Sequence, residues 1–86
     1  MKITDVQNDE QKISELTLLL IALTSWQEKI CGVNITQAWK GYDFRILDQL
    51  KEKGYIFGSK RSKLTTLTDD GLKKAEELVE KYLNDK

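Results

Sequence analysis

Residues 39–56 read WKGYDFRILDQLKEKGYI, and this stretch decides the fold that the sequence predicts. Apolar side chains recur at helical spacing in its centre, while the charged residues fall outside that apolar face. Gly41 precedes the pattern, and Gly54 follows a basic last turn, where a glycine can take the left-handed position that ends a helix. We therefore predict a short helix that stops sharply and is followed at once by a strand.

A β-hairpin and a last helix are predicted after this stretch. Residues 55–57 and 63–67 have strand-like composition, and the sequence GSKRS between them has the glycine and small polar residues of a turn. The hairpin tip is basic. Thr68 is placed to cap the last helix, and Asp69 and Asp70 suit its N-terminal dipole.

Before residues 39–56, the apolar pattern predicts a long first helix that runs to about Lys29. Gly32 is expected to end it, residues 33–35 to form a short extended piece, and Thr36 to cap a helix of one or two turns that ends near Lys40. The predicted order is helix, strand, helix, helix, strand, strand, helix. This is a mainly α (α+β) fold, a winged helix-turn-helix with a small antiparallel β-hairpin wing.

The middle of the first helix is apolar nearly all round, because a second apolar face lies beside the main stripe. Two interpretations stay open. The helix forms a homodimer or binds a partner, or it is a central helix packed between the last helix and the rest of the chain. The candidate dimer interface comprises Leu18, Ile21, Ala22, Leu78 and Tyr82.

The 86 residues, 40% hydrophobic and 33% charged, fit one small domain. Residues 1–8 are expected to be a flexible leader and residues 9–86 the single folded domain. The apolar run at 18–23 is too short for a membrane span, and the leader has no signal-peptide pattern, so we expect a cytoplasmic protein. With no histidine, one cysteine and no nucleotide-binding or nucleophile motif, we expect no enzyme, metal or cofactor.

The net charge is zero, but the charge is uneven. Residues 28–63 contain eight basic and four acidic side chains, whereas both flanking segments have more acidic than basic ones. The middle of the chain therefore suits contact with a phosphate backbone, although DNA-binding domains are usually basic overall.

Two short motifs resemble known regulators. The sequence GYI at 54–56 and LTDDG at 67–71 resemble the bracket around the wing in winged-helix regulators of the MarR and PadR kind. The ordered set LTLLLIALTSW, AWKGYDFRILDQLKEKGYI and KRSK…LTxxG, which covers residues 10–84, is similar to a family of small bacterial proteins known only as a domain of unknown function and regarded as winged helices. That family brings no established activity with it.

The resemblance implies that residues 43–53 are a recognition helix and residues 58–63 a wing. It assigns Arg45 and Gln49 to base edges. It assigns to phosphates the wing residues and those flanking the turn, which are Lys40, Tyr42, Lys60, Arg61 and Lys63.

Several residues argue against these assignments. The carboxylates of Asp43, Asp48 and Glu52 would repel phosphate if that helix approached a duplex. Arg45 could equally pair with a neighbour on a solvated helix face instead of contacting a base. A basic hairpin tip is also an ordinary way to protect the edge of a sheet, without any contact to phosphate.

The sequence predicts a non-enzymatic DNA-binding protein of the transcription-regulator type, which binds double-stranded DNA as a homodimer. The alternative is a winged-helix module for protein–protein interaction, and an enzyme is a weaker third possibility. Trp26 and Trp39 are expected to plug helix contacts rather than to stack on bases.

Overall fold

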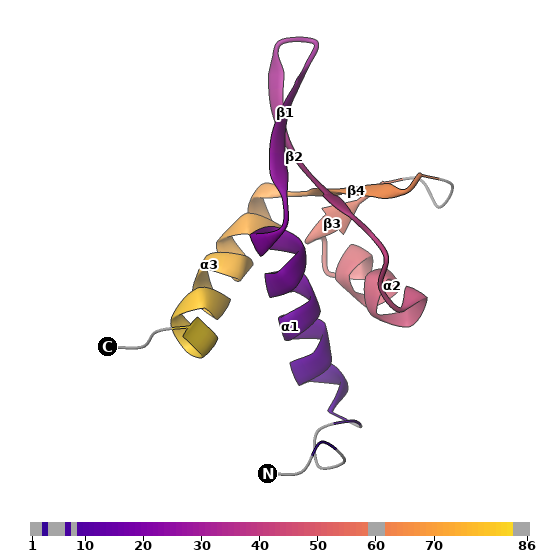
Figure 1. The fold of residues 1–86 in the computed structure, drawn as a ribbon, viewed down its shortest axis with the longest axis vertical. Helices are drawn as coiled ribbons and strands as arrows, with labels where there is room; N and C mark the ends of the chain where they lie inside the picture. The colour runs from indigo at the N-terminus through magenta and orange to yellow at the C-terminus, as the bar shows by residue number, and fades with distance from the viewer. Residues whose placement is uncertain (1–2, 4–6, 8, 59–61, 84–86) are drawn as a thin grey trace.

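The computed structural model describes residues 3, 7, 9–58 and 62–83 of the chain. Three helices and four strands follow one another in an α+β arrangement (Figure 1). In chain order they are α1 (Glu10–Leu23), β1 (Trp26–Ile30), β2 (Val33–Trp39), α2 (Phe44–Glu52), β3 (Ile56–Phe57), β4 (Leu64–Leu67) and α3 (Asp69–Leu83). The predicted helix at the centre of the chain, the hairpin after it and the last helix are confirmed as α2, β3–β4 and α3.

The four strands form one antiparallel sheet in the order β1-β2-β4-β3. The second strand of the predicted wing, β4, is not at an edge. It pairs with β3 on one side and with β2 on the other, through partners such as Thr36 and Leu67. The β1–β2 hairpin extends beyond the helices as an arm (Figure 1).

The prediction that the first helix reaches Lys29 is wrong, because α1 ends at Leu23. Thr24 donates to the Leu20 carbonyl from its backbone N–H (3.0 Å) and from Oγ1 (2.8 Å), and the Ser25 hydroxyl donates to the Ala22 carbonyl (2.6 Å). Side chains that bond back to the last carbonyls compete with further helical turns. The chain therefore leaves the helix before Trp26 and continues as a strand.

The predicted helix from Thr36 to about Lys40 is also wrong, because these residues belong to or directly follow β2. Ile30 pairs with Val33 across a two-residue turn in which Cys31 and Gly32 both have positive φ, at 52° and 79°. Positive φ at both central residues is the requirement of a type I′ hairpin turn. The observed order is helix, strand, strand, helix, strand, strand, helix, so in the described chain a strand precedes α2 where a helix-turn-helix has its first helix.

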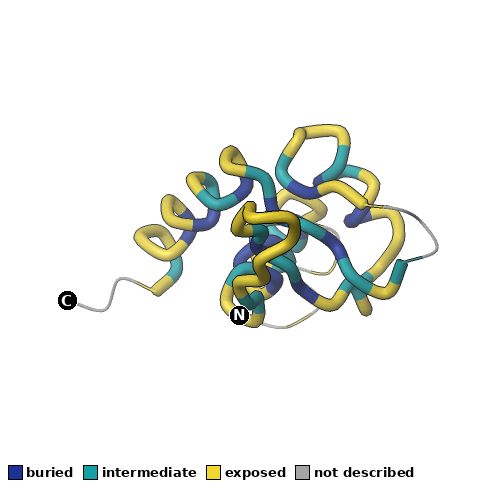
Figure 2. Tube along the Cα trace, turned by 90° about the horizontal axis from the view of Figure 1, so that it is seen from above, coloured by how far each residue is buried: buried dark blue, intermediate teal, exposed yellow. Residues whose placement is uncertain are grey.

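The core lies between the helices and one face of the sheet. That face supplies alternate strand residues, whereas each helix supplies one apolar stripe. Figure 2 shows buried positions alternating with exposed ones along α3. The buried side chains include Thr36, Ala38, Ile56, Thr65 and Leu67 from the sheet and Leu18, Leu19, Ile21, Ile46, Leu47, Leu50 and Leu78 from the helices.

Three residues of the candidate dimer interface are buried in this core. Leu18, Ile21 and Leu78 are 1%, 0% and 1% exposed, so their side chains pack inside their own chain and are not available to a second copy. Ala22 and Tyr82 are partly buried against the same core. The position of α1 corresponds to the second interpretation, a central helix packed between α3 and the rest.

The LTDDG motif forms a joint between α3 and the end of α2. The Thr68 hydroxyl accepts from the Gly71 N–H (2.9 Å) and donates to the Gly54 carbonyl (2.5 Å), while the Thr68 N–H donates to the Tyr55 carbonyl (3.0 Å). Gly71 lies so close to this backbone that a Cβ there would be 2.9 Å from the Tyr55 carbonyl carbon. Only glycine fits this approach.

Candidate functional site

The face of the sheet that points away from the helices is rich in aromatic and aliphatic side chains. Side chains alternate between the two faces of a strand, so the register assigns the outward positions. We call these ten residues the outer sheet face: Trp26, Glu28, Ile30, Val33, Ile35, Gln37, Trp39, Phe57, Leu64 and Thr66. Trp39 is 60% exposed and Phe57 56%, and none of the described helices covers them.

One row of this face crosses all four strands. Trp26 is paired with Gln37, Gln37 with Thr66, and Thr66 with Phe57. The next row contains Trp39, which lies against Trp26 with ring centroids 5.9 Å apart and planes inclined by 53°. Aromatic rings therefore lie at both sides of the row, with an amide and a hydroxyl between them.

Two lysines meet at one end of the sheet. The Lys40 N–H donates to the Lys63 carbonyl (3.2 Å), which extends the pairing of β2 with β4 by one residue. We call Lys40 and Lys63 the basic corner. Lys60 and Arg61, which were predicted to contact phosphate with them, lie outside the described residues.

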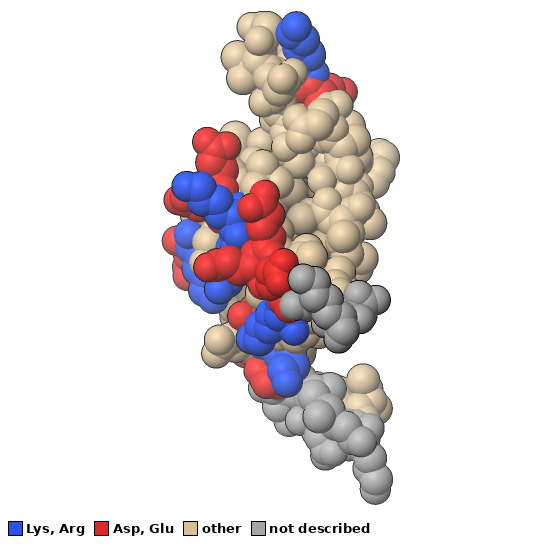
Figure 3. Space-filling model, turned by 90° about the vertical axis from the view of Figure 1, so that its left-hand side faces the viewer, with Lys and Arg blue, Asp and Glu red and all other residues tan. Residues whose placement is uncertain are grey.

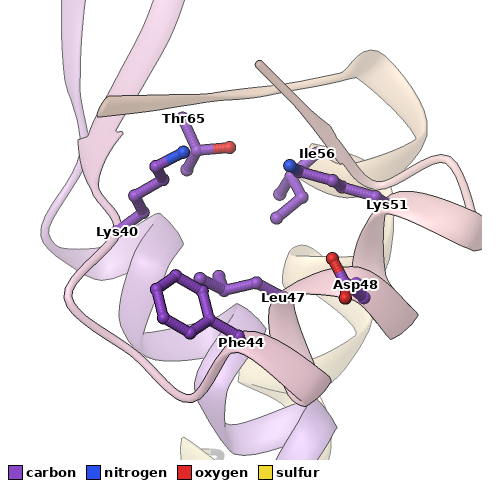
Figure 4. A pocket seen from close by; sticks show the side chains of 7 residues that line it. All are labelled: Lys40, Phe44, Leu47, Asp48, Lys51, Ile56 and Thr65. Atoms are coloured by element: carbon purple, nitrogen blue, oxygen red, sulfur yellow. The ribbon is translucent and has the colours of Figure 1, made fainter. Parts of the chain in front are cut away.

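A hollow of about 320 Å³ lies beside this corner, between α2 and the sheet. Its floor is apolar, and Lys40 and Lys51 extend from opposite walls toward its opening, with Asp48 nearby (Figure 4). Phe44 stands at the rim and is 77% exposed. The two ammonium groups and one carboxylate make the charge around this hollow positive.

The two residues predicted to read bases are not part of this arrangement. Arg45 lies 3.7 Å from Asp43, the residue whose side chain caps α2, and both side chains are well exposed. Gln49 donates to Glu10 of α1 (3.4 Å). The structure thus brings Lys40 and Lys63 together but directs Arg45 and Gln49 toward other neighbours, and Tyr42 is partly buried against the core.

The charged surface elsewhere is mixed. Figure 3 shows Lys, Arg, Asp and Glu close together on the side formed by α3, next to a broad uncharged area. Here Lys81 (2.8 Å) and the Tyr82 hydroxyl (2.7 Å) both donate to Glu15 of α1. These hydrogen bonds lower the pKa of the Glu15 carboxyl and raise the pKa of Lys81 and of Tyr82. The cluster ties α1 to α3.

Residues 9–85 match the family described as a domain of unknown function, DUF6429. The chain belongs to the DUF6429 family. It is 41% identical over 71 residues to the uncharacterized protein y4hR of Sinorhizobium fredii (strain NBRC 101917 / NGR234), an alignment that covers 81% of this chain and 86% of that protein. No solved structure matches the chain. The expected membership of an uncharacterised family is thereby confirmed.

Sequence reasoning missed the outer sheet face of this DUF6429 domain. The prediction that Trp39 plugs a helix contact is wrong, because its side chain is mostly exposed on β2. The alternation of Val33, Ile35, Gln37 and Trp39 was the available signal, since residues two apart share one face of a strand.

The described part of the chain contains neither a group of metal-binding side chains nor a membrane-spanning helix. No group of three His, Cys, Asp or Glu side chains there could hold a metal ion. No described helix is long and apolar enough to cross a membrane.

Proposed function

We propose that this DUF6429 protein is a cytoplasmic, non-enzymatic nucleic-acid-binding protein of the transcription-regulator type, and that its basic corner contacts the phosphate backbone. The observation that carries the proposal is the backbone hydrogen bond from Lys40 to Lys63, which pairs two lysines from segments distant in sequence on the same face of one end of the sheet. Lys51 adds a third ammonium group across the adjacent hollow. Lysines gathered in this way bind phosphates and release counterions.

A winged-helix interpretation supports the proposal in part. The succession of α2, Gly54, β3 and β4 is that of a recognition helix followed by its wing, and the basic connection between β3 and β4 contains Lys60 and Arg61 in the sequence. The strand β2 takes the place of the first helix of the motif. We therefore propose that the β3–β4 wing, rather than α2, makes the principal contact with nucleic acid. The exposed side of α2 carries Asp48 and Glu52, whose carboxylates would repel phosphate.

The test is charge reversal at the corner. The double variant Lys40→Glu/Lys63→Glu is compared with Lys12→Glu/Lys73→Glu, which makes the same charge change in the N-terminal halves of α1 and α3. Duplex DNA of random sequence is titrated at several salt concentrations. The corner variant should bind at least about tenfold more weakly and lose about two units from the slope of log K against log salt. An unchanged affinity and slope would show that the corner makes no phosphate contact.

A second candidate, a protein-interaction module that forms a homodimer, is favoured by the free side of α1. Leu16, Leu20 and Leu23 are 43%, 47% and 59% exposed and recur at the spacing of one helix face. Two copies of such a stripe are self-complementary across a two-fold axis. This stripe replaces the buried residues of the predicted interface.

Light scattering across a concentration series tests the homodimer. The native chain should double in mass as the concentration rises, and Leu16→Glu/Leu20→Glu should remain a folded monomer. A native chain that stays monomeric at high concentration would exclude this interface.

A further inference from the structure

We propose that the outer sheet face is a platform for unpaired nucleobases, so that the preferred ligand is a single-stranded nucleic acid. This inference rests on the proposed function and names its ligand class. Bases would lie over the strands of the outer sheet face, and phosphates would reach the basic corner where the bound strand passes around the end of the sheet.

The first step is the exposure of flat rings. Trp39 on β2 and Phe57 on β3 are both more than half exposed, and Trp26 supports Trp39 from the neighbouring strand. β2 and β3 are separated by β4, so the two exposed aromatic positions lie about 10 Å apart across the sheet. Single-strand-binding sheets use rings in this way, because every base presents a π-face to an aromatic side chain.

The second step is what lies between the rings. Gln37 and Thr66 occupy the middle of the row, and both are only partly buried. Their amide and hydroxyl groups match the hydrogen-bonding edges of bases. A wholly apolar partner would bury these polar groups without compensation, which costs free energy. The composition of the row therefore favours bases over an apolar protein surface.

The third step is charge. Glu28 is the one charged residue of the outer sheet face, and it lies toward the hairpin arm. At the opposite end, Lys40 directly follows Trp39 and Lys63 directly precedes its partner Leu64. Because side chains alternate along a strand, both lysines of the corner point to the helix side of the sheet at this end. The polyanionic backbone of a strand whose bases cover the outer face would meet this positive charge where it passes around the end of the sheet.

The face also explains why the bases must be unpaired. In a duplex the bases are stacked on one another, and only their edges are accessible in the grooves. A ring on a sheet reaches the face of a base only when that base has left the stack. A single strand, or a duplex with an unpaired end, meets this requirement.

Intrinsic fluorescence provides a direct test, because Trp26 and Trp39 are the two tryptophans of the chain. The intact protein is titrated with a 12-nucleotide thymidine oligomer and, separately, with a blunt 12-base-pair duplex. The oligomer should quench the tryptophan emission and bind at least about tenfold more tightly than the duplex. Trp39→Ala, at a mostly exposed site, should lower the affinity for the oligomer about tenfold or more.

Leu83→Ala is the control, since it removes a half-exposed apolar side chain at the end of α3, outside the outer sheet face and the hollow. It should bind the oligomer as the native chain does. If Trp39→Ala also binds the oligomer as the native chain does, the inference is wrong. The same holds if Trp39→Ala instead abolishes a homodimer that shows no quenching, because the face is then a protein interface.

The failures of the two proposals are distinguishable. Duplex binding that depends on the basic corner, without any preference for the oligomer or dependence on Trp39, leaves the proposed function intact and overturns this inference. No binding of either probe at low salt overturns both.

Discussion

Replacing Gly71 by alanine tests the joint that holds α3 against the end of α2. The Cβ of Gly71→Ala would overlap the Tyr55 carbonyl oxygen and lie 2.9 Å from its carbonyl carbon and 3.1 Å from its Cα. Backbone atoms cannot rotate away as a flexible side chain does. The first turn of α3 must therefore move, which lengthens the hydrogen bonds from Thr68 to Tyr55 and from Gly71 to Thr68.

The expected magnitude follows from two opposing effects. Overpacking of this kind costs about 1–3 kcal/mol, and loss of the Thr68 cap adds about 1 kcal/mol. Alanine recovers up to about 1 kcal/mol through its higher helix propensity. The net loss in the free energy of unfolding is about 2 kcal/mol, which lowers the melting temperature of a domain of this size by roughly 10 °C.

Thermal unfolding followed by circular dichroism measures this shift. Gly41→Ala is the control, because a Cβ at Gly41 would meet no atom within 4 Å, and it should change stability by less than about 0.5 kcal/mol. If Gly71→Ala melts at the native temperature, the close approach of α3 to Tyr55 is wrong.

Two further predictions concern the α1–α3 contact and the hairpin arm. Since Lys81 and Tyr82 hold the pKa of Glu15 below its unfolded value, the ionised carboxylate stabilises the fold above that value and loses this effect as pH falls through the folded pKa. In urea unfolding, Glu15→Gln should therefore be less stable than the native chain at pH 7 and converge with it as the pH falls through the folded pKa of Glu15. A constant difference at all pH values would contradict this. Cys31→Asn should stabilise the arm by about 0.5–1 kcal/mol, because asparagine adopts the positive φ of 52° more easily. Slower amide exchange in the arm is the expected result, and faster exchange would count against the turn.

The sequence was a good guide where the determinants are local. The apolar spacing in α2, the stop at Gly54 and the cap at Thr68 each depend on a few neighbouring residues. The extended piece predicted at residues 33–35 is the start of β2. The strand β1 was missed because Trp26 and Ile30 continue the helical spacing of α1, and the rest of β2 was missed because its pairing with β4 depends on residues about thirty positions away.

In the candidate site, too, the local features were predicted from the sequence and the non-local ones were not. Lys40 and Lys63 were identified by residue type and by the resemblance, but their contact depends on the non-local pairing of β2 with β4. Trp39 was assigned to a helix contact because an aromatic side chain next to a tight glycine turn more often holds two helices together, and nothing local indicates that the outer sheet face is open. Which face of a strand is covered depends on where the helices pack, which the strand sequence alone does not specify.

The most direct test of the central claim is an amide-shift titration of the isotope-labelled protein with the thymidine oligomer, at low and then at moderate salt. We expect salt-sensitive shifts at Lys40 and Lys63, together with shifts of the Trp39 indole N–H, and none along the exposed side of α3. No shift at low salt, or shifts confined to α3, would contradict the claim that the basic corner binds nucleic acid.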